Sequence, residues 1–153
     1  MTLELLIPPL PLTLALCGII FLAAHFVPVS NIVFSHTQGE WAIAFWVISL
    51  LFVVPAAMHF FKAKTTVDPR YPEKSQTLVI NGIYKLSRNP MYVGFWFAII
   101  GCTLFTGNAL GGIFTLFFIP YMNRFQILPE ERHLKQKFGK TYADYCLNVR
   151  RWL

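Results

Sequence analysis

The chain has 153 residues, of which 56% are hydrophobic and only 13% are charged. This composition, with a mean hydropathy of +0.53, excludes an ordinary soluble domain and indicates an integral membrane protein. The net charge of +6 is better explained by membrane topology and anionic lipid headgroups than by nucleic acid, because no basic and aromatic nucleic-acid-binding pattern is present.

Two apolar windows in the first part of the chain predict transmembrane helices. Leu10 to Val29 and Trp41 to Phe61 contain no Lys, Arg, Asp or Glu. Each window matches the roughly 20 residues that a helix needs to cross the hydrocarbon core. No basic residue precedes the first window and no small-residue cleavage pattern clearly follows it, so we expect it to be retained rather than removed as a signal peptide.

A third apolar region, Met91 to Leu128, is interrupted near its middle by "TGNALGG". This pattern predicts a helical hairpin, because Gly and Asn disrupt helices and favour turns. The first arm is short for a full crossing, so the hairpin could be transmembrane or partly re-entrant.

The basic residues predict the orientation in the membrane. All thirteen Lys and Arg lie in two blocks, the first from Lys62 to Arg88 and the second from Arg124 to Arg151. The positive-inside rule assigns both blocks to the cytoplasm. The expected topology is therefore four transmembrane helices with both termini inside. The loop from Asn31 to Gly39 would then lie outside.

The cysteines do not indicate a metal site. Cys17, Cys102 and Cys146 are scattered without a C-x-x-C pair. Neither a disulfide framework nor a zinc site is expected, and the three thiols are interpreted as small buried apolar groups.

The stretch "YKLSRNPMY", from Tyr84 to Tyr92, directly precedes the third apolar region. Asn89 is suited to cap a helix and Pro90 to occupy its first position, so the third membrane helix should begin here. Its free backbone N–H groups and the adjacent Arg88 could hold an anion. The alternative is a capped helix whose arginine only reaches lipid phosphates.

The C-terminal segment "LPEERHLKQKFGKTYADYCLNVRRWL" predicts two helices. Pro129 suits a first helical turn, and Glu130 and Glu131 would face the positive end of the helix dipole. Gly139 is a predicted stop. Beyond it a short amphipathic helix on the membrane surface is expected, because aromatic and apolar residues recur at helical spacing at Tyr142, Tyr145, Val149 and Trp152.

These motifs occur in a specific order between Lys62 and Leu153. "TTVDP" is followed by G-x-Y-x-x-x-R-[HN]-P-x-Y, a hydrophobic hairpin, E-E-x-x-L and F-G-x-x-Y-x-x-Y. The order resembles that of the isoprenylcysteine carboxyl methyltransferase family, particularly its short prokaryotic members, and more distantly that of the phospholipid methyltransferases.

The resemblance implies an all-α integral membrane enzyme that uses S-adenosyl-L-methionine, enclosed by C-terminal helices and loops rather than by a Rossmann domain. It implies one domain, with residues 1–61 as a two-helix anchor and residues 62–153 as the cofactor-binding and catalytic part. Arg88 and Glu131 would be catalytic. The cofactor-binding residues would be Tyr84, Asn89, Pro90, Tyr92, Glu130, Glu131, His133, Leu134, Tyr142 and Tyr145.

The chemistry of these residues suits the cofactor. Arg88 could hold a carboxylate, Glu130 and Glu131 could accept from an ammonium, and the tyrosine rings could stack on adenine. The alternatives are compensation of the helix dipole by the glutamates and interfacial placement of the tyrosines. Many relatives have His where this chain has Asn89, which argues against an imidazole-specific role at that position.

The methyl acceptor is expected to be a lipophilic molecule from the bilayer. The resemblance favours a carboxylate of the isoprenylcysteine type, which is already ionised and needs only alignment and exclusion of water. An isoprenoid acid, a fatty acid or a lipid amine would also fit, and an amine would need a base. Two alternative hypotheses for the function of the protein are an NADPH-dependent membrane reductase and a non-enzymatic scaffold whose helices pack through Gly107 and Gly111.

Overall fold

The computed structural model describes residues 4–27, 38–62 and 77–153. The regular elements there are helices, as predicted: α1 (Pro9–Phe26), α2 (Gln38–Lys62), the 3-10 turn η3 (Gly82–Lys85), α3 (Pro90–Thr106), α4 (Ala109–Met122), the π-helical turn η4 (Asn123–Ile127) and α5 (Leu128–Asn148). Most of the predicted polar loop from Lys62 to Asn81, and most of the outer loop from Asn31 to Gly39, lie outside the described residues.

Helices α1 and α2, with 18 and 25 residues, are long and apolar enough to cross a membrane, in agreement with the two predicted spans. Large apolar side chains on both helices are well exposed, for example Leu14 at 63% and Leu51 at 62%. A soluble protein rarely presents such a surface to water, whereas a bilayer accommodates it. Helix α3 has 17 residues and is apolar but shorter.

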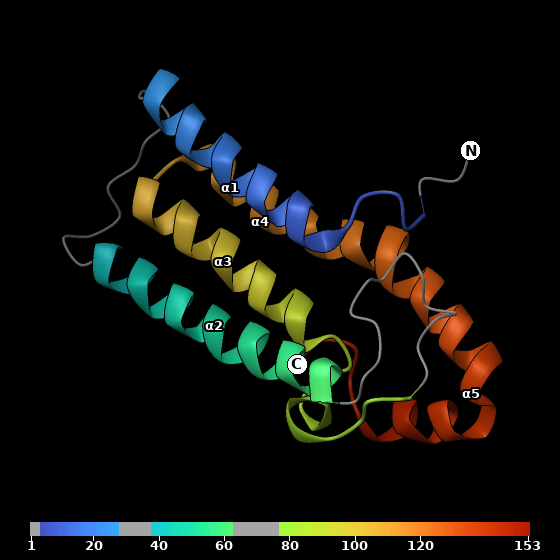
Figure 1. Cartoon of the computed structure of the whole chain (residues 1–153). Helices are drawn as coiled ribbons and strands as arrows, with labels where there is room; N and C mark the ends of the chain where they lie inside the picture. Colours follow the sequence, from blue (N-terminus) through green and yellow to red (C-terminus); the bar gives the residue numbers. More distant parts are fainter. Residues whose placement is uncertain (1–3, 28–37, 63–76) are drawn as a thin grey trace.

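Helix α3 lies at the centre of the bundle, with α2 on one side and α1 and α4 on the other (Figure 1). Gly94 allows α2 and α3 to approach closely. A Cβ atom at Gly94 would lie 2.5 Å from Cγ2 of Val53 and 2.9 Å from the carbonyl oxygen of Ser49. Small residues at helix contacts are the usual means of close packing in membranes.

The interruption predicted near "TGNALGG" is only two residues long. Gly107 adopts the left-handed conformation with φ of 63° and ends α3, and Asn108 begins α4 by accepting a hydrogen bond of 3.0 Å from the Leu110 N–H. Helices α3 and α4 then pack together, with Nε1 of Trp96 donating to the Thr115 carbonyl at 3.0 Å.

The segment before α1 is attached to the junction of α4 and α5. The carboxylate of Glu4 pairs with Arg124 at 2.8 Å and also with Arg132. The side-chain amide of Gln126, in η4, donates to the Ile7 carbonyl at 2.6 Å. The N-terminal end of α1 and the second basic block therefore lie at the same end of the bundle.

Helix α5 bends sharply at Gly139, where φ is 51° and ψ is −121°, so the predicted break is confirmed. The two arms of α5 point in different directions from this bend (Figure 1). The prediction that helical structure continues through Trp152 is wrong, because α5 ends at Asn148. Trp152 instead packs against the hydrophobic core, and its Nε1 donates to Oδ1 of Asn123 at 3.0 Å.

We expect Gly94→Ala to destabilise the bundle by about 1 to 3 kcal/mol, because the added methyl group meets α2 backbone as well as a side chain. Thermal unfolding in detergent, followed by circular dichroism, measures the effect. Gly112→Ala is the matched control, since a Cβ there meets nothing within 4 Å. Equal unfolding temperatures for the two variants would contradict this account of the α2–α3 contact.

Candidate functional site

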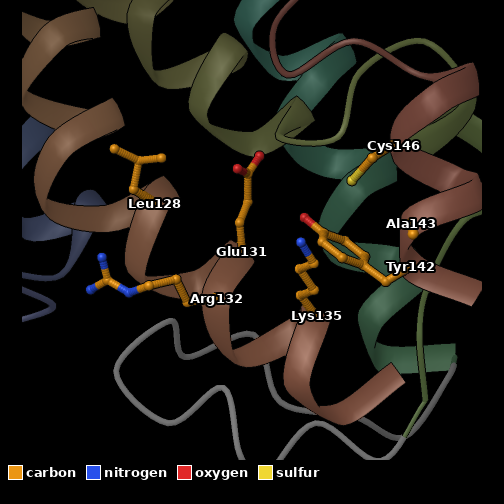
Figure 2. A pocket seen from close by; sticks show the side chains of 7 residues that line it. All are labelled: Leu128, Glu131, Arg132, Lys135, Tyr142, Ala143 and Cys146. Carbon is orange, nitrogen blue, oxygen red and sulfur yellow. The ribbon is translucent and has the colours of Figure 1, made fainter. Parts of the chain in front are cut away.

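A cleft of about 360 Å³ lies between the two arms of α5. Residues of both arms line it, as Figure 2 shows: Leu128, Glu131, Arg132, Lys135, Tyr142, Ala143 and Cys146. The bend at Gly139 creates the cleft, because a straight helix would carry the second arm away from the first.

Glu131 lies on the inner side of this cleft between two arginines. Arg151 binds it through two hydrogen bonds, from Nε to Oε1 at 3.0 Å and from Nη2 to Oε2 at 2.7 Å. The Nη2 atom of Arg88 is 3.3 Å from Oε1, and the side chains of Arg88 and Glu131 are only 13% and 17% exposed. Arg88 also donates to Sγ of Cys146. A carboxylate so far removed from water requires such partners.

The C-terminal tail, defined here as residues Val149–Leu153, holds the "SRNP" stretch in place. The Arg88 N–H donates to the Arg150 carbonyl at 2.9 Å, and Nδ2 of Asn89 donates to the Arg151 carbonyl, also at 2.9 Å. The Ser87 hydroxyl adds a bond of 3.3 Å to the same Arg151 oxygen. Segments far apart in the sequence therefore meet beside the cleft.

The start of α3 differs from its prediction in one respect. Pro90 does occupy the first helical turn after Asn89, but the Asn89 side chain makes no capping bond. The Asn89 N–H donates to the Ser87 hydroxyl at 3.1 Å, and the Asn89 carbonyl accepts from Tyr92 and Val93. These three N–H groups are thus already bonded and are not free for an anion. We therefore expect an anion to bind the cationic side chains rather than these three N–H groups.

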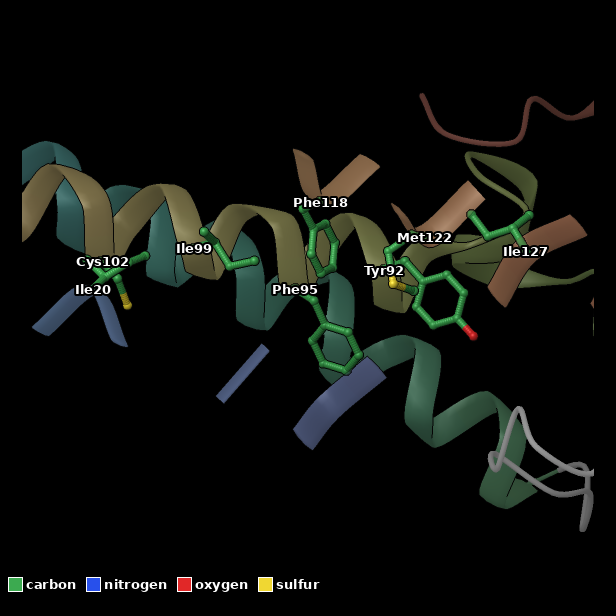
Figure 3. Packing of buried hydrophobic residues seen from close by; sticks show 8 residues of the cluster. All are labelled: Ile20, Tyr92, Phe95, Ile99, Cys102, Phe118, Met122 and Ile127. Carbon is green, nitrogen blue, oxygen red and sulfur yellow. The ribbon is translucent and has the colours of Figure 1, made fainter. Parts of the chain in front are cut away.

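The carboxyl group of Glu130 has different surroundings from that of its neighbour Glu131. It accepts a hydrogen bond of 2.6 Å from the Tyr92 hydroxyl, which extends from the end of the buried cluster shown in Figure 3. Burial raises the pKa of Glu130 to about 8, against the opposing effect of the Tyr92 hydrogen bond. Two consecutive carboxyl groups are therefore differentiated by their surroundings, one neutral at pH 7 and one paired with cations.

Three buried tyrosines lie at the second arm of α5: Tyr142 and Tyr145 belong to this arm, and Tyr84 lies in η3. The Tyr145 hydroxyl donates to the Tyr84 carbonyl at 2.7 Å, and Tyr142 lines the cleft. Burial raises the pKa of Tyr84, Tyr142 and Tyr145, so their hydroxyls remain protonated donors at neutral pH. The buried Tyr84 hydroxyl has no hydrogen-bond partner within the described part of the chain.

Two of the expected site residues line the cleft, and several others contact one another beside it. Glu131 and Tyr142 line the cleft and Arg88 contacts Glu131 beneath it. His133 is exposed and Leu134 is half-buried, and neither lines the cleft, so their roles remain predictions. In the residues that the structure describes, no group of three His, Cys, Asp or Glu side chains could hold a metal ion.

Three residues in or beside the cleft were not predicted from the sequence: Lys135 and Cys146, which line it, and Arg151, which binds Glu131. The sequence places Arg151 in the second basic block, next to the helix expected on the membrane surface, and gives it no contact within the protein. Cys146 was interpreted as a buried apolar group, and Lys135 as one of many basic residues. Only the positions of Lys135 and Cys146 beside the E-E-x-x-L and F-G-x-x-Y-x-x-Y motifs could have indicated them.

Glu130 should make stability fall as the pH rises. Its pKa lies near 8 in the folded chain and near the ordinary 4.5 when exposed, so only the folded state holds this proton between those values. The unfolding temperature in detergent should therefore decrease from about pH 5 to about pH 8. Glu130→Gln, which mimics the protonated acid, should flatten this dependence, and an unchanged slope would refute the assignment.

Comparison with known proteins agrees with the motifs. The sequence model of the phospholipid methyltransferase family matches residues 37–141. An uncharacterized protein of Haemophilus influenzae is 41% identical over 63 residues, covering 41% of this chain and all of the relative. No solved structure matches the chain.

Two named relatives are longer proteins. A probable protein-S-isoprenylcysteine O-methyltransferase of Oryza sativa subsp. indica is 34% identical over 67% of this chain, and the match covers 52% of the relative. The protein-S-isoprenylcysteine O-methyltransferase of Schizosaccharomyces pombe is 34% identical over 50% of this chain and 32% of its own length. The chain thus spans about half the length of such relatives or less. With the matched motifs and the extent of the family match, these findings show that the chain belongs to the phospholipid methyltransferase family.

Proposed function

We propose that this protein transfers a methyl group from S-adenosyl-L-methionine to a lipophilic acceptor at the cytoplasmic surface of a membrane. The observation that carries the proposal is the cluster of Arg88, Glu131 and Arg151 beside a cleft walled by Tyr142, in a chain with the motif order of membrane methyltransferases. The motifs that define the family resemblance and the cleft occupy the same part of the chain.

The residues of the cleft fit the cofactor. A volume of about 360 Å³ lies within the range of roughly 300 to 1,000 Å³ that small-molecule sites have. Glu131 offers a carboxylate to an ammonium, Tyr142 offers a ring, and the buried Nε of Arg88 is a donor without a partner in the described residues. When bound, S-adenosyl-L-methionine supplies an electrophilic methyl group on a sulfonium.

A carboxylate of the isoprenylcysteine type is the acceptor that we propose first. Even without Arg151, positive charge exceeds negative charge at the cleft, because Arg132 and Lys135 line it and Arg88 lies beside Glu131. This surplus attracts an anionic acceptor, which is a competent nucleophile without proton removal. The apolar faces of the bundle would guide a prenyl or acyl chain toward the same end.

A lipid amine is the second candidate, and Glu130 is the observation that favours it. An amine must lose a proton before it accepts a methyl group, and a base serves best when its pKa is close to the working pH. Burial raises the pKa of Glu130 to about 8, so the carboxylate form that could accept the proton becomes the main form only above about pH 8. Assays with an acid and an amine of equal chain length separate the two candidates.

For the membrane arrangement we propose four crossings with both termini in the cytoplasm. The contacts of Glu4 with Arg124, and of Arg88 with Glu131, support this topology. They join the N-terminal segment and both basic blocks at one end of the bundle, which the positive-inside rule assigns to the cytoplasm. The inner membrane of a prokaryote is the proposed location.

Titration with S-adenosylhomocysteine should raise the unfolding temperature of the purified protein in detergent, because a ligand that binds only the folded state stabilises it. NADPH should have no effect. Glu131→Gln should weaken S-adenosylhomocysteine binding roughly tenfold, since it removes a charged hydrogen-bond acceptor and leaves two arginines facing each other.

Asp144→Asn, an exposed acid on the same helix, is the matched control and should bind within about twofold of the parent. Stabilisation by NADPH would instead indicate a reductase. Stabilisation by neither compound would favour a non-enzymatic scaffold. Calorimetry that returns equal affinities for Glu131→Gln and Asp144→Asn would limit Glu131 to a structural role.

Arg88→Lys tests the arginine of the "RNP" stretch. Lysine keeps the charge but loses the planar pair of donors that contacts Glu131 and Cys146, so methyl transfer should fall at least about tenfold, or roughly 1.4 kcal/mol. The rate is measured with labelled S-adenosyl-L-methionine. Lys85→Arg, an exposed cation nearby, should leave it unchanged. Parental activity of Arg88→Lys would limit Arg88 to a structural ion pair with Glu131.

A further inference from the structure

The C-terminal tail, residues Val149–Leu153, is bound to the protein along most of its length. The carbonyl groups of Arg150 and Arg151 accept from the Arg88 N–H and the Asn89 side chain, both at 2.9 Å. Trp152 packs against the hydrophobic core. The Arg151 side chain is therefore held at a fixed place relative to the start of α3, which is what a functional contact requires.

The contact between Arg151 and Glu131 is better defined than that between Arg88 and Glu131. Arg151 reaches both carboxylate oxygens, at 3.0 and 2.7 Å, whereas Arg88 reaches one oxygen at 3.3 Å. A pair of parallel hydrogen bonds fixes the plane of a carboxylate, while a single longer contact leaves it free to rotate. Arg151 thus determines the orientation of Glu131 in the cleft.

A role as a lipid-headgroup contact does not account for this geometry. The Arg151 side chain is 34% exposed, and its Nε and Nη2 atoms are both committed to Glu131. Arg124 provides the contrast: its side chain is 60% exposed, and its Nη1 pairs with Glu4 on the outside of the bundle. In the described part of the chain, Glu131 thus pairs with Arg88 and Arg151 at the cleft, whereas Arg124 pairs with Glu4 and does not line the cleft.

We propose that Arg151 is a positioning residue for methyl transfer, which holds the Glu131 carboxylate in the orientation needed to bind the cofactor. The C-terminal tail is then part of the site. This inference rests on the proposed function, because it assigns Arg151 an effect that is exerted only through Glu131. Loss of the Arg151 side chain should weaken the binding of the cofactor and leave the binding of the acceptor unchanged.

The test compares Arg151→Gln and Arg151→Lys with Arg124→Gln, which removes an arginine from a surface pair. The affinity for S-adenosylhomocysteine is measured by calorimetry, and KM for each substrate by initial rates. Arg151→Gln should weaken binding about tenfold and raise KM for S-adenosyl-L-methionine similarly, without changing KM for the acceptor. Arg151→Lys should recover part of the affinity, and Arg124→Gln should match the parent.

A double variant keeps the inference testable if Arg151→Gln is less stable. In a chain that already carries Glu131→Gln, adding Arg151→Gln should cause no further loss of affinity, because the group that Arg151 positions is gone. Additive losses would overturn the inference, and so would a lower kcat with both KM values unchanged. A parent chain that does not bind S-adenosylhomocysteine would instead refute the proposed function itself.

Discussion

A carboxylate placed between two guanidinium groups connects the parts of this protein. Glu131 comes from α5, Arg88 from the stretch before α3, and Arg151 from the C-terminal tail. Leaving a largely buried charge without its partner costs about 3 to 5 kcal/mol, so these segments are coupled strongly. The tail can dock only if the second arm of α5 returns toward α3, and that return is also what forms the cleft.

At the start of α5, two consecutive glutamates, Glu130 and Glu131, differ in charge. Glu131 is paired with cations, whereas Glu130 points toward the Tyr92 hydroxyl at the edge of the core and is held neutral by burial. A helix turns about 100° per residue, so neighbouring side chains enter different environments. The E-E pair thus combines an anionic group and a neutral acid, which is a common way for one site to provide two chemical functions.

The helices could be predicted from the sequence because their causes are local. Apolar runs specify α1 and α2, Pro90 specifies the start of α3, and Gly139 specifies the break in α5. The end of α5 was not predictable from periodicity, since the core contact of Trp152 overrides the helical spacing. Asn89 does not cap α3 through its side chain for a similar reason: its Nδ2 donates to the Arg151 carbonyl, and the N–H groups of Tyr92 and Val93 bond to the Asn89 backbone carbonyl. The contact of Arg88 with Glu131 depends on the tertiary fold and was not predicted; the family resemblance only placed both residues in one site.

The bend at Gly139 divides α5 into two arms that meet at one residue, so a change in the backbone angles of Gly139 would rotate the second arm relative to the first. Cys146 lies seven residues beyond Gly139, or about 10 Å along the second arm. A rotation of about 10° at Gly139 would therefore displace Cys146 by roughly 2 Å. Residues other than glycine strongly disfavour a φ of 51° with a ψ of −121°. The far end of the arm is anchored by the bond from Tyr145 to Tyr84. The width of the cleft therefore depends on one backbone position and on the contacts that hold the second arm, including that of Arg88 with Cys146, so a small rotation at Gly139 is magnified at the place where a ligand would bind.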